Sequence, residues 1–138
     1  MSSTTSYREL SFTTLCQSGR RLVLSVDDEP AILLTRERIL EFAGYRVVSA
    51  KDGEQALQLF AEQPVELVLL DFKMPGVDGG IVAQRMKSSK PWVPILLVSA
   101  SEVSDETLAT VDCRIDKGHG PVPLLEKVAE YLNLVTST

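Results

Sequence analysis

The sequence predicts an α/β protein in which helices cover both faces of one parallel β-sheet. Short apolar runs of strand length alternate five times with segments whose apolar residues recur at helical spacing. The runs contain few polar residues, which is typical of parallel strands buried on both faces. A length of 138 residues fits one domain, and a domain of this size needs no metal or disulfide to support its core.

The first predicted strand and helix have clear boundaries. The apolar run 22–26 stops at two aspartates, and Pro30 suits the first turn of the helix that follows. Gly44 is typical of a helix end. The residues that follow at helical spacing in this helix are Ile32, Leu33, Arg36, Ile39, Leu40 and Ala43.

The rest of the chain repeats this strand and helix pattern. Asp52, with Gln55 three residues later, predicts the start of a helix that runs through Glu62. Pro75 and three glycines predict a loop over 72–80. The other predicted elements are strands over 45–50, 65–70, 94–98 and 111–115, and helices over 81–88, 104–110 and 123–134.

Charge and composition exclude several classes of protein. There are 14 basic and 19 acidic residues, a net charge of −5, which argues against a module that binds nucleic acid. No apolar segment approaches the roughly 20 residues of a membrane helix. Cys16 and Cys113 lie far apart, as expected of reduced thiols in a cytoplasmic protein. We expect a flexible leader over 1–20, one folded domain over 21–134 and a short tail over 135–138.

Polar residues stand where the predicted strands end. Asp27 and Asp28 follow the first strand, Asp71 ends the third, Ser99 ends the fourth, and Lys117 follows the fifth. Ligands of open α/β sheets bind beyond the carboxyl ends of the strands, so these side chains should converge there. Each residue alone could be a helix cap, a turn residue or a surface charge. Their convergence favours a functional site.

The residue types at this edge suit phosphoryl transfer. Clustered carboxylates repel one another without a cation, and oxygen ligands without His or Cys favour Mg²⁺ or Mn²⁺. A carboxylate beside such a metal can attack a phosphoryl group and form an acyl phosphate. A lysine adds positive charge, and a small hydroxyl can bind the product. His119, the single histidine, is predicted to be an exposed loop residue.

These residues resemble the response-regulator receiver domain family (CheY-like) of two-component signalling. The resemblance covers 21–132 and implies a flavodoxin-like (β/α)5 fold with strand order 2-1-3-4-5. The residues that carry it are Val26-Asp27-Asp28-Glu29-Pro30, Leu70-Asp71-Phe72-Lys73-Met74-Pro75-Gly76-Val77-Asp78-Gly79, Val98-Ser99-Ala100 and Lys117.

The resemblance implies a role for each site residue. Asp71 matches the phosphoacceptor. Mg²⁺ (or Mn²⁺) would be held by Asp28 directly, by Asp27 through water, by Asp71, and by the backbone carbonyl of Lys73. Ser99 matches the switch hydroxyl that binds the phosphoryl group, and Lys117 matches the lysine that contacts it.

Three features depart from the family pattern. Gly118 replaces the usual proline after Lys117, which predicts a trans bond and a less firmly placed lysine. Arg114 stands where an aromatic switch residue is common, and we expect it to face solvent or to pair with Glu102 or Asp105. Lys117 lies only 18 positions after Ser99, so the intervening helix should be short.

The predicted function is a stand-alone receiver domain that takes a phosphoryl group from a sensor histidine kinase or a histidine phosphotransfer protein. It would catalyse only its own phosphorylation and hydrolysis, and would act through a partner protein, without nucleic acid or membrane insertion. A phosphorylation-independent interaction module with the same fold is the alternative. A haloacid-dehalogenase-type phosphatase is disfavoured because Lys73, not Asp, stands two residues after Asp71. No glycine-rich turn follows the first strand, which disfavours nucleotide-binding loops.

Overall fold

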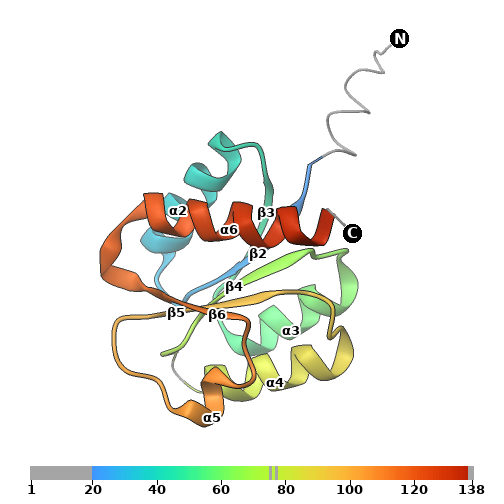
Figure 1. Ribbon diagram of the computed structural model, residues 1–138, viewed down its shortest axis with the longest axis vertical. Coiled ribbons are helices and arrows are strands. Elements are labelled where there is room, and N and C mark those ends of the chain that lie inside the picture. The colour runs from blue at the N-terminus through green and yellow to red at the C-terminus, as the bar shows by residue number, and fades with distance from the viewer. Residues whose placement is uncertain (1–19, 75, 77, 137–138) are drawn as a thin grey trace.

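Five parallel strands form one sheet, and helices cover both of its faces (Figure 1). The computed structural model describes residues 20–74, 76 and 78–136, so almost all of the predicted leader and the last two residues of the predicted tail lie outside the described residues. The strands are β2 (Leu22–Val26), β3 (Arg46–Ala50), β4 (Leu67–Asp71), β5 (Ile95–Ser99) and β6 (Cys113–Asp116). Their order, β3-β2-β4-β5-β6, confirms the predicted 2-1-3-4-5 topology.

Helices connect successive strands, as the alternating sequence pattern predicts. They are α2 (Pro30–Phe42), α3 (Gly53–Glu62), α4 (Gly79–Ser89), the four-residue α5 (Asp105–Leu108) and α6 (Pro121–Thr136), with a 3-10 turn η1 (Lys117–His119) before α6. The predicted α/β fold class is therefore confirmed. Within the described residues, no helix combines the length and apolar character needed to cross a membrane.

Two apolar cores lie on opposite faces of the sheet. Ala56 and Phe60 of α3 pack with Val82 and Met86 of α4 against one face of the strands. Leu40 of α2 packs with Leu124, Val128 and Leu132 of α6 against the other face. The three inner strands β2, β4 and β5 are buried along their whole length, because helices cover them on both sides.

The start of α3 follows the predicted capping pattern with one difference. The Asp52 carboxylate accepts a hydrogen bond from the Gln55 amide at 2.8 Å, as predicted. The Gln55 side chain accepts one from the Lys51 amide at 2.9 Å, one residue before the position expected of a capping box. Both amides at the exposed helix start are thus satisfied by side chains.

Several predicted boundaries differ from the structure, and three of them have a clear local cause. Helix α4 begins at Gly79, two residues early, because Asp78 caps it by accepting a hydrogen bond from the Gly80 amide at 2.7 Å. Strand β6 begins at Cys113, two residues late, because the amides of Thr110 and Val111 still bond to α5 carbonyls. Helix α6 begins at Pro121, since proline suits a first helical turn.

Candidate functional site at the carboxyl ends of the strands

The carboxyl ends of four neighbouring strands bring the predicted site residues to one edge of the sheet. Val26 pairs with Leu70, so Asp27 and Asp71 follow adjacent positions of neighbouring strands. Ser99 pairs with Asp116 at the end of β5 and β6, next to Lys117. The sheet register therefore produces the predicted convergence, although the residues come from segments up to 90 positions apart.

Three carboxylates form the centre of this site. One oxygen from each of Asp27, Asp28 and Asp71 lies within 4.8 Å of the others. Asp27 is fully buried and Asp71 is 3% exposed, whereas Asp28 is open to solvent. The cluster thus has a buried side formed by Asp27 and an open side formed by Asp28.

The residues present fit a hard divalent cation. Asp27 Oδ2 is buried and makes no hydrogen bond of good geometry to a described residue. Every atom of the cluster that could bind metal is a carboxylate oxygen, the donor that Mg²⁺ and Mn²⁺ prefer. The exposed Asp28 leaves room for the water ligands that Mg²⁺ usually keeps.

Lys117 reaches into this cluster from η1. Its Nζ lies 3.2 Å from Asp27 Oδ2 and 3.3 Å from Asp71 Oδ1, so it bridges both buried carboxylates. The Asp116 carboxylate accepts a hydrogen bond from the Gly118 amide at 2.8 Å and shapes this turn. No described peptide bond is cis. Lys117 thus has two ion-pair partners, and its placement being less firm than in the family stays a prediction.

Burial and neighbouring charges act on the ionisation of Asp71 and Lys117. Burial raises the pKa of Asp71, and the negative charge of Asp27 adds to this effect while Lys117 opposes it. Burial alone would lower the pKa of Lys117, but its bond to Asp27 and the charges of Asp71 and Asp27 outweigh burial and raise it. Lys117 therefore stays positively charged, and its charge offsets the repulsion between Asp27 and Asp71.

Ser99 lies beside the cluster with its hydroxyl turned toward its own loop. Its Oγ donates to the Ser101 carbonyl at 2.7 Å and accepts from the Ser101 amide at 3.1 Å. A hollow of about 330 Å³ separates this loop from the carboxylates. Its lining residues are Asp28, Glu29, Asp71, Lys73, Ser99, Ala100, Ser101 and Lys117.

Arg114 does not behave as predicted. Its Nη2 donates to the carbonyls of Ser101 at 2.9 Å and Ser99 at 3.4 Å, and the side chain is half-buried. The predicted pairing with Glu102 or Asp105 is wrong, because the carbonyls of the 99–101 loop lie within reach of this strand position. The arginine thus fastens the loop that carries Ser99.

No role in this site was predicted for Arg36. The residue stands at helical spacing among apolar residues of α2, and its charged side chain is buried there. The side chain is 7% exposed, and its Nη2 lies 3.6 Å from Asp27 Oδ2. A basic residue at a core-facing helical position was the available signal, because a buried charge requires a partner.

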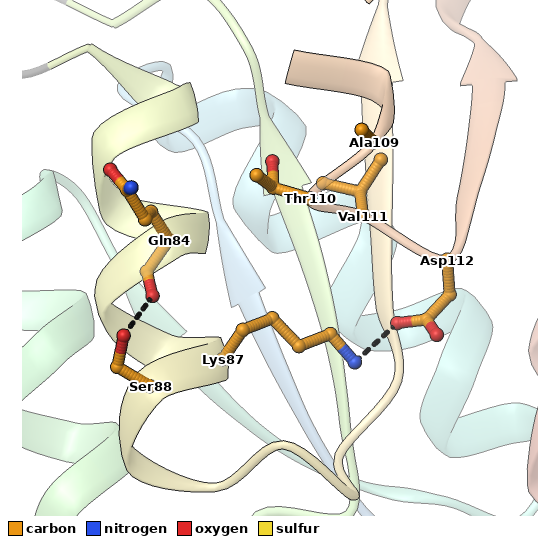
Figure 2. A pocket seen from close by; sticks show the side chains of 7 residues that line it. All are labelled: Gln84, Lys87, Ser88, Ala109, Thr110, Val111 and Asp112. Atoms are coloured by element: carbon orange, nitrogen blue, oxygen red, sulfur yellow. Dashed lines mark hydrogen bonds and ion pairs between the residues drawn. The ribbon is translucent and has the colours of Figure 1, made fainter. Parts of the chain in front are cut away.

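Another hollow lies at the opposite end of β5 and β6. Figure 2 shows Lys87 reaching across it from α4 to Asp112, with the two charged groups 2.6 Å apart. Asp112 Oδ2 also accepts a hydrogen bond from the Ile95 amide, so both charges are already paired. The Lys87–Asp112 ion pair therefore holds the start of β6, and it leaves neither of these two charges free for a ligand.

Comparisons with known proteins agree with the fold and the site. The sequence profile of the response regulator receiver domain family matches residues 23–118, which is more than half of the chain. The chain belongs to this family and is a receiver domain of two-component signalling. The matched segment contains the three clustered carboxylates, Ser99 and Lys117.

Two curated relatives show how the similarity is distributed. "Probable transcriptional regulator ycf27" of Porphyridium aerugineum is 41% identical over 116 residues, which cover 82% of this chain and 48% of the relative. "Response regulator MprA" of Mycolicibacterium vanbaalenii is 37% identical over 94 residues, which cover 68% of this chain and 41% of the relative. The chain thus spans about half of the length of these relatives.

Solved structures share the whole fold. The response regulator TrrA of Thermotoga maritima, in complex with Mg²⁺ and BeF, is 34% identical with a TM-score of 0.77 over 80% of this chain and 98% of that one. A CheY-like receiver domain of Methanospirillum hungatei is 29% identical with a TM-score of 0.79, covering 83% and 95%. TrrA has also been solved in complex with the histidine kinase ThkA.

Proposed function

We propose that Asp71 accepts a phosphoryl group from a histidine kinase or a histidine phosphotransfer protein. The observation that carries this proposal is the position of Asp71 at the end of a buried strand, among two further carboxylates and 3.3 Å from Lys117. An Asp71 oxygen would attack phosphorus while the phosphorus–nitrogen bond of the donor breaks, leaving an acyl phosphate on Asp71. Water would later hydrolyse the acyl phosphate on Asp71 and release inorganic phosphate.

The proposed metal ligands are Asp27, Asp28, Asp71 and the backbone carbonyl of Lys73. A bound Mg²⁺ or Mn²⁺ would offset negative charge on the phosphoryl oxygens. Lys117 would hold the acceptor carboxylate and then the phosphoryl group. The complex of TrrA with Mg²⁺ and BeF supports this assignment by analogy.

Ser99 has a proposed role in reading the phosphorylated state. To donate to a phosphoryl oxygen, its hydroxyl must leave the Ser101 carbonyl, which lies 2.7 Å away. Phosphorylation adds charge and acceptor oxygens at Asp71, and these compete for the hydroxyl. The 99–101 loop, whose carbonyls Arg114 bonds, would then reorganise. Arg114 would take part in this change at the position where the family often has an aromatic switch residue.

The signal is proposed to leave the domain through contact with another protein. The acidic net charge of −5 supports output through protein contact in place of direct binding to nucleic acid. We propose residues 21–134 as the receiver unit. Since the proposed phosphoryl donors depend on ATP, we place it in the cytoplasm.

Mass mapping after incubation with acetyl phosphate and Mg²⁺ tests the proposal. We expect one phosphoryl adduct on the peptide that contains Asp71, and none in Asp71→Asn. Asp52→Asn is the matched control, because asparagine caps a helix as well as aspartate does and this site is remote. An adduct on Asp27 or Asp28 of the unmodified protein would refute the assignment.

An interaction module that works without phosphorylation is the second candidate. The bonds of Ser99 and Arg114 to the 99–101 loop favour it, because they hold the loop in one arrangement without any phosphoryl group. Beryllofluoride with Mg²⁺ separates the two candidates. A Mg²⁺-dependent change in the spectrum or melting temperature supports phosphorylation, and no response supports the second candidate.

A further inference from the structure

Arg36 is a buried charge beside the proposed metal site. It lies on α2, one turn before the fully buried Leu40, and only 7% of it is exposed. An arginine remains a cation at neutral pH, and a cation removed from water is costly unless a partner balances it. The position of this charge therefore requires an explanation in the residues around it.

The opposing strand has a matching polar position. Along β2, Val23, Ser25 and then Asp27 face α2, because alternate residues of a strand share a face. Ser25 is fully buried, and its hydroxyl oxygen lies 3.5 Å from Arg36 Nη1. A small hydroxyl in an otherwise apolar strand thus leaves room for the arginine to extend toward Asp27.

Asp27 is the residue on which the site's cations meet. Its Oδ2 lies 3.6 Å from Arg36 Nη2 and 3.2 Å from Lys117 Nζ, while its Oδ1 accepts the Glu29 amide at 3.0 Å. Fully ionised, the three carboxylates and these two cations leave one net negative charge. Without Arg36 the site would carry two.

Arg36 does not line the open side of the site. The hollow at the carboxylates is lined by Asp28, Lys73 and Lys117 but not by Arg36, which lines a separate groove between α2 and α6. A cation that enters from the open side would not need to displace the guanidinium. The positive charge of Arg36 is therefore a constant part of the site.

We propose that Arg36 is a built-in counter-cation that positions Asp27 and weakens the binding of divalent metal. The second half of this inference rests on the proposed metal site, and the first half does not. Arg36 holds Asp27 in the metal-free protein, so the buried carboxylate does not depend on a metal ion for its partner. The same positive charge repels a cation entering the site.

Titration with Mg²⁺ in calorimetry tests the effect on metal binding. Arg36→Met removes the charge and keeps an unbranched apolar side chain, and it should bind Mg²⁺ about fivefold to tenfold more tightly than the wild type, the scale of one nearby full charge. Arg38→Met, at an exposed position of the same helix, should bind as the wild type does. Arg36→Lys should lie close to the wild type. Equal Mg²⁺ affinity in Arg36→Met and the wild type would overturn this part.

A double-mutant cycle without metal tests the positioning of Asp27. Arg36→Met should lower the melting temperature by about 5–10 °C, because it leaves Asp27 with one partner fewer. Asp27→Asn should cost less stability in the Arg36→Met background than in the wild type, where it also leaves Arg36 unpaired. Equal costs of Asp27→Asn in both backgrounds would overturn the inference. Arg36→Gln replaces Arg36→Met in both experiments if the latter does not fold.

The two experiments separate this inference from the proposed function. A wild type that binds no Mg²⁺ would contradict the proposed metal site, and the metal-free cycle would still decide whether Arg36 positions Asp27. A wild type that binds Mg²⁺ with the same affinity as Arg36→Met would leave the metal site intact and remove the effect of Arg36 on metal binding.

Discussion

The two halves of the site are built in different ways. At the ends of β2 and β4, Asp27 and Asp71 follow strands that are buried along their whole length. At the end of β5, Ser99 leads into a loop that is held by its own hydroxyl and by Arg114. The next helix, α5, has four residues and buries none of them.

This difference separates the place of the proposed phosphoryl transfer from the place of the proposed response at Ser99. The sheet register fixes the acidic half of the site, which is formed by Asp27, Asp28 and Asp71 at the ends of β2 and β4. Moving one of these carboxylates would require moving a strand. Side-chain bonds to loop carbonyls fix the other half, and such bonds can be exchanged without disturbing the core. The acidic half is thus preorganised, and the half formed by β5 and β6 can be rearranged.

The largest expected effect concerns the two neighbouring aspartates of the acidic half. Asp27→Ala should lower the free energy of unfolding by about 3–5 kcal/mol, because it leaves Arg36 buried without its partner. Asp28→Ala should change it by less than about 0.5 kcal/mol, since Asp28 is exposed. Urea unfolding without Mg²⁺ measures both. Similar losses would show that burial does not distinguish the two residues.

A smaller effect is expected at Arg114 in the other half. Arg114→Ala should cost about 1.5–3 kcal/mol, because it removes charge-assisted hydrogen bonds to the 99–101 loop. The affinity for Mg²⁺ should stay unchanged, since Arg114 does not touch the carboxylates. Arg85→Ala, at an exposed position of α4, is the control for urea unfolding. A loss no greater than that of the control would mean that Arg114 does not fasten the loop.

The pH dependence of stability should reveal the cost of ionising Asp71, which is buried and lies beside the charge of Asp27. Its pKa is raised in the folded protein, so its contribution is most favourable below the unfolded-state pKa, about 3.9, and is lost as the pH rises through the folded-state pKa. Asp71→Asn should therefore melt at a higher temperature than the wild type at neutral pH without metal. This advantage should shrink toward pH 4 and should be absent in Asp105→Asn, which alters an exposed carboxylate. An advantage that grows on acidification would contradict the direction of the shift.

The smallest effect is expected at Gly118, the position that departs from the family pattern. A Cβ there would meet Asp116 Oδ1 at 3.4 Å, an ordinary contact, so Gly118→Ala should change stability by less than about 0.5 kcal/mol. Gly120 has φ +81° and ψ −172°, and Gly120→Ala should cost about 1–3 kcal/mol. Thermal melting of both variants compares them. A large loss at Gly118 would show that this turn depends on glycine.

The same contrast explains what could be predicted from the sequence. Apolar runs and their polar ends are local signals, so the strands and the convergence of Asp27, Asp28, Asp71, Ser99 and Lys117 could be predicted. The strand order came from the family resemblance, because local signals leave several orders open. The partners of Arg114 could not be predicted, because its long side chain can reach several acceptors and only the folded loop determines which of them lie near. Arg36 follows at helical spacing among apolar residues, but its contact with Asp27 depends on the packing of α2 over β2.

The short helix α5 has a further consequence for how the molecule opens. A single helical turn that buries no residue has little to hold it closed, so its amides should exchange with solvent through local opening. The amides of β2 and β4 should exchange only when the whole domain unfolds, because both strands are central and fully buried. A protein that binds α5 could therefore change its conformation at little energetic cost, while the carboxylates at the ends of β2 and β4 keep their positions.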